Sequence, residues 1–224
     1  MSDERKIKAA IVDHRLGNLY SVKLACEHVG MQAEVTDEAA EILASDVVIL
    51  PGVGAYEDAM IALNESGLSK VLHEVAARGT PLVGVCLGLQ LLMTESFEFG
   101  HHLGLGLIEG QVLPFDKPQD ENGRVLKVPQ VCWNRIHRPA SVQWEDSFLD
   151  GVDDNEYMYF VHSFYVQPAN EDVILATTTY GDVEFCSSLR RRNVFATQFH
   201  PERSGPQGLR VYENIAAYCK SARI

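Results

Sequence analysis

A cysteine that stands between two glycines, at the end of a short apolar run, limits the fold of this chain more than any other feature. The apolar residues 81–85 end at Cys86, Gly84 and Gly88 lie two positions to either side of it, and an apolar segment with helical spacing covers residues 87–94. This order predicts a strand, a tight turn and a helix. The glycines fit the turn because its strained backbone leaves no room for neighbouring Cβ atoms.

The turn also predicts a reactive thiol. At the N-terminus of a helix the dipole favours a thiolate, and free N–H groups can bind an oxyanion. His200 is the candidate general base and Glu202 the group that orients it, and their spacing of two residues places both on one side of an extended strand. We therefore predict that Cys86, His200 and Glu202 form a catalytic triad.

Residues 51–54, Pro-Gly-Val-Gly, directly follow an apolar strand predicted over residues 46–50. One interpretation is a simple turn between a strand and a helix. The other is an oxyanion hole, in which the backbone N–H groups of Val53 and Leu87 stabilise a tetrahedral intermediate; losing one such donor typically costs about two orders of magnitude in rate. Gly52 and Gly54 would allow this backbone to reorient, and beside the cysteine turn we favour the oxyanion hole.

Strand and helix patterns alternate through the first half of the chain, whereas the second half is rich in strands. We predict an α/β fold in one domain, residues 1–224: an open, mostly parallel sheet with flanking helices and an added antiparallel portion. Ligands bind such sheets at the carboxyl ends of the strands, where both glycine-rich turns lie. The predicted strands are 8–13, 32–36, 46–50, 81–85, 107–113, 125–131, 157–166, 173–179, 183–189 and 194–199, and the helices are 18–29, 56–77 with a break near 66–67, 87–94 and 208–222.

Charge and cysteine content exclude several classes of protein. The formal net charge of −12 argues against binding to nucleic acid, whose phosphates require a basic surface. The basic residues 190–192 separate two strand-like runs and indicate a solvated turn, with contact to a partner or an anionic ligand as the alternative. The five cysteines are odd in number and contain no Cys-x-x-Cys pair, so neither a disulfide framework nor a zinc site is indicated. We predict no metal and no other cofactor, since phosphate-loop and dinucleotide motifs are also missing from the sequence.

Two features of the sequence bear on its location. Residues 1–8 are charged and lack the apolar core of a signal peptide. The longest apolar run, residues 81–93, is too short to span a bilayer and contains Gln90. We therefore expect a cytoplasmic protein that does not contact membranes.

Seven segments together resemble the glutaminase subunit of imidazole glycerol phosphate synthase, a family of class I glutamine amidotransferases. A Cys-His-Glu triad with His-x-Glu spacing is shared by many class I amidotransferases, but Pro-Gly-Val-Gly, Lys-Val-Pro with Trp-Asn, and Phe-Val-His-Ser are more specific to this family. The segments follow the family's order along nearly the whole chain and are residues 13–22, 50–55, 84–92, 104–108, 127–129 with 133–134, 159–163 and 198–205.

This resemblance implies an activity and a partner. The chain would hydrolyse glutamine to glutamate and ammonia and pass the ammonia to a separate TIM-barrel cyclase in a heterodimer of histidine biosynthesis. The glutamine site would include Gly52, Gly54, Gln90 and the backbone of Ser163 and Phe164. An ordinary polar position on a helix is the alternative for Gln90, although it lies one turn beyond Cys86 on the same helix face.

The sequence departs from the family pattern at three places. Residues 130–132 are Gln-Val-Cys where His-Met-Gly is usual, residues 14–16 are His-Arg-Leu where Tyr-Gly-Met is common, and Phe164 replaces a common Tyr. Trp133 is expected either to seal a subunit interface or to lie in the core. These departures motivate a rival acceptor, such as a sugar amidotransferase partner. The sequence leaves two further functions open: a free-standing cysteine hydrolase of γ-glutamyl compounds and, against the intact triad, a non-catalytic interaction subunit.

Overall fold

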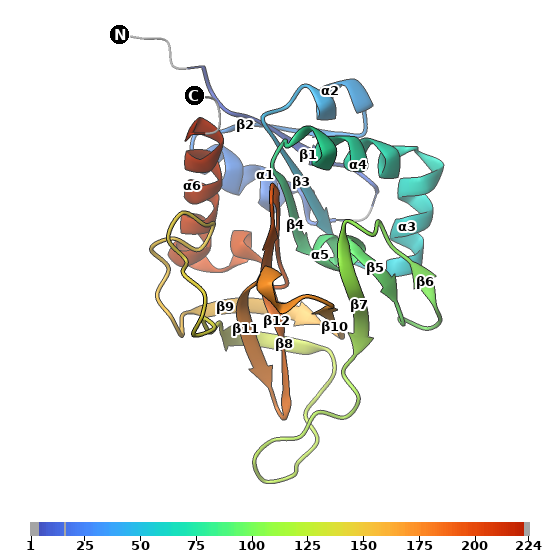
Figure 1. Ribbon diagram of the computed structural model, residues 1–224, viewed down its shortest axis with the longest axis vertical. Coiled ribbons are helices and arrows are strands. Elements are labelled where there is room, and N and C mark those ends of the chain that lie inside the picture. Colours follow the sequence, from blue (N-terminus) through green and yellow to red (C-terminus); the bar gives the residue numbers. More distant parts are fainter. Residues whose placement is uncertain (1–4, 16, 222–224) are drawn as a thin grey trace.

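The computed structural model of the protein describes residues 5–15 and 17–221. Within these residues most strands form one large sheet, and two form a small separate one (Figure 1). The strands are β1 (Lys8–Val12), β2 (Gln32–Thr36), β3 (Val47–Gly52), β4 (Leu82–Cys86), β5 (Met93–Ser96), β6 (His102–Leu103), β7 (Ile108–Pro114), β8 (Gln130–Arg135), β9 (Tyr157–His162), β10 (Phe164–Pro168), β11 (Ile174–Tyr180), β12 (Val183–Arg191) and β13 (Val194–Thr197). The helices are α1 (Leu19–His28), α2 (Ala39–Leu43), α3 (Tyr56–Glu65), α4 (Leu68–Arg78), α5 (Leu87–Leu91) and α6 (Gly205–Ser221), with the 3₁₀ turns η1 (Glu171–Val173) and η2 (Pro201–Arg203).

The large sheet has a parallel half and a mainly antiparallel half. Its order is β2-β1-β3-β4-β13-β12-β10-β7-β5-β6, with β11 paired to β12. The five neighbouring strands β2, β1, β3, β4 and β13 run parallel to one another. Beyond them, β13 pairs antiparallel with β12, β12 with β10, and β10 with β7. The predicted α/β fold, a mostly parallel sheet with flanking helices and an antiparallel addition, is therefore confirmed.

Helices cover both faces of the parallel half (Figure 1). Because side chains alternate along a strand, Ile11 joins the core cluster that includes α1 and α6, and Val12 joins the cluster that includes α2 to α5. Burial on both faces explains why β1, β3 and β4 are continuous apolar runs rather than alternating ones. No helix in the described part of the chain is both long enough and apolar enough to cross a membrane.

Several expected boundaries were wrong. The segment expected as one strand over residues 157–166 divides at Ser163: β9 pairs with β8 in the small sheet, and β10 pairs with β7 and β12 in the large one. The strand expected over 125–131 begins only at Gln130, after Pro129, which has no N–H to donate to a ladder. The helix expected over 87–94 ends at Leu91, whose carbonyl accepts the N–H of Leu105 at 2.9 Å. The short elements α2, β5 and β6 were not expected at all.

Other expectations about the elements are confirmed. The expected break near residues 66–67 separates α3 from α4, with Gly67 at φ 74°. The basic residues 190–192 lie at the hairpin between β12 and β13, as expected: Arg190 and Arg191 end β12 and pair with β13, and Arg192 and Asn193 connect the two strands. Trp133 is 51% exposed, which excludes the interpretation as a core residue.

Gly88→Ala is expected to destabilise the fold strongly, because a Cβ at residue 88 would lie 1.8 Å from the carbonyl oxygen of Leu50 in β3. The expected loss in free energy of unfolding, measured by urea titration, is about 3 kcal/mol, since overpacking forces the backbone to shift. Gly67→Ala is the control: a Cβ there meets no atom within 4 Å, and only the positive φ should cost about 1 kcal/mol. Equal losses in the two variants would contradict the steric explanation.

Candidate active site

The candidate nucleophile lies at the carboxyl end of the central parallel strand. Cys86 ends β4 and directly precedes α5, which is the strand–turn–helix order predicted from the sequence. Its backbone has φ 54° and ψ −108°, a conformation that residues with a side chain rarely adopt. A Cβ at Gly84 would lie 2.9 Å from the backbone of Gly88, so the glycines on both sides of the cysteine allow α5 to pack directly on the strands.

His200 and Glu202 come together in a way that the sequence did not predict. We expected both on a strand, but β13 ends at Thr197, His200 precedes η2, and Glu202 lies within that 3₁₀ turn. The expectation was wrong because Pro201 cannot continue a ladder and favours the start of a helical turn. The Nδ1–H of His200 nevertheless donates to Oε1 of Glu202 at 2.8 Å, and the Glu202 side chain is fully buried.

The surroundings of His200 favour its protonated form. Burial alone would lower the pKa of its imidazole, but the neighbouring Cys86 side chain and the Glu202 carboxylate, to which His200 is hydrogen-bonded, together raise that pKa to about 10. The backbone is fixed as well: the N–H of His200 donates to the carbonyl of Tyr159 at 2.9 Å, and the Ser204 hydroxyl donates to the His200 carbonyl at 2.7 Å. The arrangement therefore favours the imidazolium form of His200 at neutral pH.

A buried amide network connects the thiol to the candidate glutamine site. Nε2 of Gln90 donates to the Phe164 carbonyl at 2.9 Å and to Oε1 of Gln198 at 3.2 Å. Nε2 of Gln198 in turn lies 3.7 Å from Sγ of Cys86. Gln90 thus contacts the segment of Ser163 and Phe164 that we expected beside it in the glutamine site, and it is buried, with 4% of its surface exposed.

The Pro-Gly-Val-Gly segment lies beside the cysteine turn. In the parallel register of β3 and β4, Gly52 is the partner of Cys86, so Val53 and Leu87 are the first residues beyond the ends of the two strands. Gly54 has φ 100°, which favours glycine at that position. The structure therefore brings the two candidate oxyanion donors to the same end of the sheet as the thiol.

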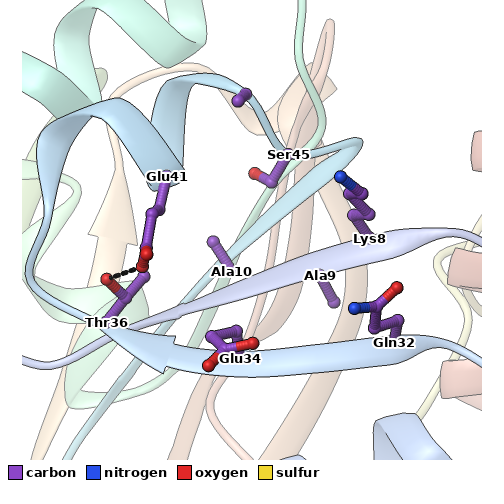
Figure 2. A pocket seen from close by; sticks show the side chains of 9 residues that line it. Lys8, Ala9, Ala10, Gln32, Glu34, Thr36, Glu41 and Ser45 are labelled. Atoms are coloured by element: carbon purple, nitrogen blue, oxygen red, sulfur yellow. Dashed lines mark hydrogen bonds between the residues drawn. The ribbon is translucent and has the colours of Figure 1, made fainter.

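A cavity of about 230 Å³ elsewhere in the molecule is not part of this site (Figure 2). It lies between α2 and the strands β1 and β2 and contains no residue predicted for catalysis. The hydroxyl of Thr36 donates to the carboxylate of Glu41 across it, so these polar groups already have partners. Nowhere among the described side chains do three or more His, Cys, Asp or Glu groups gather so that they could hold a metal ion.

Comparison with known proteins agrees with this geometry. The family model "Glutamine amidotransferase class-I" matches residues 10–217. The chain is 47% identical over 207 residues to the imidazole glycerol phosphate synthase subunit HisH of Syntrophotalea carbinolica, covering 92% of this chain and 97% of that protein. It is 43% identical over 215 residues to the HisH subunit of Moorella thermoacetica, covering 95% and 96%.

The chain belongs to the class I glutamine amidotransferase family. The fold of this amidotransferase is also similar to that of PurLQS from Thermotoga maritima, with a TM-score of 0.70 at 21% identity, covering 96% of this chain and 99% of that one. It is likewise similar to the structure of another glutamine amidotransferase, with a TM-score of 0.69 at 20% identity, covering 93% and 98% of the two chains.

Two residues of the amidotransferase site were missed from the sequence. Gln198 is fully buried and contacts both Cys86 and Gln90, and the signal that could have found it is its place two residues before His200. The Asn18 amide donates to Oε1 of Glu202 at 3.3 Å. Asn18 lies 184 residues from Glu202 in the sequence, so only the fold could reveal the contact.

A second histidine near the triad is held neutral. Burial lowers the pKa of His162 to about 4; a hydrogen bond to the Phe164 carbonyl opposes this shift, and the charge of His200 adds to it. Because that carbonyl can only accept, Nδ1 of His162 carries the proton and donates at 2.8 Å. His162 thus fixes the backbone of the candidate glutamine site without carrying charge.

The neutral state of His162 has a consequence for acid stability. Its pKa in the folded protein is about 4, below the ordinary value of 6.5, so between these values the unfolded chain binds the proton and the folded one does not. Its contribution to the free energy of unfolding should therefore be unchanged above pH 6.5 and fall by roughly 2 kcal/mol by pH 5. His162→Asn keeps a donor for the Phe164 carbonyl but cannot titrate. Urea titrations at pH 7.5 and 5.0 should show a smaller acid loss in the variant; an equal loss would contradict the assignment.

Proposed function

We propose that this chain is the glutaminase subunit of imidazole glycerol phosphate synthase and supplies ammonia to a cyclase in histidine biosynthesis, as a cytoplasmic heterodimer. The glutaminase activity accords with the class I amidotransferase family and with the HisH relatives. The observation that carries the mechanism is the buried His200, hydrogen-bonded to Glu202 and protonated opposite the strained Cys86.

Glutamine hydrolysis then proceeds in two stages. The Cys86 thiolate attacks the carbon of the glutamine carboxamide, and the carbonyl oxygen gains the negative charge that the N–H groups of Val53 and Leu87 stabilise. Protonated His200 gives its proton to the departing ammonia as the C–N bond breaks, which leaves a thioester on Cys86. The neutral imidazole then takes a proton from water, the resulting hydroxide attacks the thioester, and glutamate leaves as the thiolate is restored.

The role of Glu202 in these steps is orientation and charge stabilisation. Its carboxylate accepts from Nδ1 of His200, which directs Nε2 toward the reacting atoms and stabilises the imidazolium. Gln90, Gln198 and the Phe164 carbonyl form the rigid wall against which the amino-acid end of glutamine would bind. Gly52 and Gly54 would let the opposite backbone close over that substrate.

An exposed aromatic face beside the site supports docking of the cyclase. Val131, Trp133 and Tyr157 are each about half exposed on the small sheet of β8 and β9. Trp133 contacts Tyr159 edge-on at 6.1 Å, and the carbonyl of Tyr159 holds the backbone of His200. Exposed aromatic clusters of this kind are typical of protein–protein interfaces. A partner seated here would receive ammonia close to where it forms.

Cys86→Ala should abolish glutamine hydrolysis, because no other group can form the thioester. Ammonia-dependent synthesis by the complex with the cyclase should be retained, since that step does not use the thiol. Cys132→Ser is the matched control, at a partly exposed cysteine within strand β8 rather than at a strand–helix turn, and should keep glutaminase activity. Appreciable glutamine turnover by Cys86→Ala in a coupled glutamate assay would falsify the assignment of the nucleophile.

The amidotransferase is also expected to depend on its partner. The Pro-Gly-Val-Gly backbone can keep its donor away from the thiol until the partner with bound acceptor favours the active arrangement. Cyclase with its ligand should raise glutamine turnover at least tenfold, which requires about 1.4 kcal/mol. Gly54→Ala, strained at φ 100°, should reduce this increase more than it weakens glutamine binding.

Two outcomes of the same assay would favour the rivals. Full glutamine turnover by the isolated chain would indicate a free-standing hydrolase. Activation by a sugar amidotransferase synthase, but not by the cyclase, would indicate the other acceptor.

A further inference from the structure

A buried histidine contacts the backbone of the Pro-Gly-Val-Gly segment from outside the triad. His14 is 2% exposed, and its Nε2 lies 2.7 Å from the carbonyl oxygen of Pro51. Since the carbonyl can only accept, Nε2 carries a hydrogen and donates it, and the buried Nδ1 has no partner among the described residues. The contact joins the loop after β1 to the residue just before Gly52.

The sheet explains why this carbonyl needs a side-chain partner. The ladder between β1 and β3 ends at the pair Ile11 and Ile49, after which β1 continues to pair only with β2. The N–H of Asp13 already donates to the carbonyl of Thr36 at 3.0 Å. The Pro51 carbonyl, two residues beyond the end of the ladder, therefore has no strand neighbour on this side, and the His14 imidazole replaces the missing backbone donor.

The loop is shaped to present this imidazole. Arg15, the next residue, has φ 68°, an uncommon conformation for a residue with a side chain. Its N–H donates to Oδ1 of Asp13 at 2.8 Å, which closes a tight turn around His14. Backbone strain persists where the surroundings fix it, and here it places His14 against β3.

The other end of the segment is fixed as well. The N–H of Tyr56, the first residue of α3, donates to Oε2 of Glu98 at 3.1 Å, and both side chains are buried. Between the Pro51 carbonyl and the Tyr56 N–H lie only residues 52–55, which include the positive φ of Gly54 and the half-exposed Val53. Any reorientation of the Val53 N–H is thereby confined to a short stretch between two fixed points.

We propose that His14 is a positioning residue of the reaction: it fixes the peptide before Gly52, so that the Val53 N–H can turn toward the tetrahedral intermediate without displacing β3. This inference rests on the proposed oxyanion role of Val53. A preorganised donor stabilises developing charge without reorganisation at the moment of reaction, so loosening its support lowers the rate of the chemical step rather than substrate binding. His14 touches neither substrate nor the reacting atoms.

The test compares His14→Leu, which fills the same space without a donor, with His14→Gln, whose amide nitrogen can reach the Pro51 carbonyl. With the cyclase and its ligand present, His14→Leu should lower kcat for glutamine roughly tenfold and leave KM within about twofold. Alkylation of Cys86 by iodoacetamide needs no oxyanion hole and should proceed at the wild-type rate. His14→Gln should restore most of kcat, and His28→Leu, at an exposed histidine, should match the wild type.

Hydrogen exchange gives a readout that does not depend on activity. Deuterium uptake over residues 51–56 should rise in His14→Leu and not in His14→Gln, while uptake over residues 82–92 stays unchanged. Unchanged exchange at 51–56, equal loss of alkylation and of turnover, or no rescue by His14→Gln would each overturn the inference. If the wild-type complex shows no glutaminase activity, the proposed function fails, and the exchange comparison still decides whether His14 fixes this segment.

Discussion

The parallel register between β3 and β4 is the constraint on which the site depends. The pairing runs from Val48 and Leu82 to Gly52 and Cys86, so both strands end at the same level. The Pro-Gly-Val-Gly backbone therefore continues beside the cysteine turn, although more than thirty residues separate the two in the chain. The same register brings Gly88 of α5 against the carbonyl of Leu50, and a slip of one residue would exchange the buried faces of the strand and separate the thiol from its candidate oxyanion donors.

Charge burial gives the site reactivity rather than stability. The His200 imidazolium and the Glu202 carboxylate lie together and are shielded from water, and the removal of such groups from solvent costs several kcal/mol per ion before their mutual attraction offsets it. Hydrogen bonds offset part of this cost. Oε1 of Glu202 accepts from His200 and from Asn18, and both the N–H and the carbonyl of the His200 backbone are hydrogen-bonded. The neutral His162 adds no further positive charge beside His200. The buried imidazolium thus faces the Glu202 carboxylate, which keeps the proton on His200, the candidate acid.

The sequence predicted the parts of the site that depend on local backbone geometry. The glycines around Cys86 and the apolar run before it predict the tight turn that the structure has at Cys86. Gly54 likewise predicts a local bend of the backbone, which the structure has in its positive φ. What the sequence could not show is pairing across long separations. The division of residues 157–166 between two sheets follows from which strands lie nearby, and the contacts of Asn18, Gln198 and His14 join segments more than thirty residues apart. The 3₁₀ turn at Glu202 was missed for another reason. The spacing of two residues between His200 and Glu202 suggested an extended strand, although the intervening Pro201 favours a turn.

The small sheet of β8 and β9 belongs both to the candidate site and to the exposed surface beside it. One strand, β9, contributes to two surfaces: the Val161 carbonyl lies 3.8 Å from the Cys86 thiol and the Tyr159 carbonyl binds His200, while Trp133 of the neighbouring strand β8 is exposed opposite Tyr159. A protein that binds the aromatic face of β8 and β9 therefore contacts elements that also hold Cys86 and His200, two members of the candidate triad. Coupling between binding sites requires an element whose arrangement both sites can bias. On one side of the thiol β9 meets this condition by its contacts, and on the other side the segment between Pro51 and Tyr56 carries the candidate donor of Val53, so a partner that spans both could adjust the candidate nucleophile and the candidate oxyanion donors together.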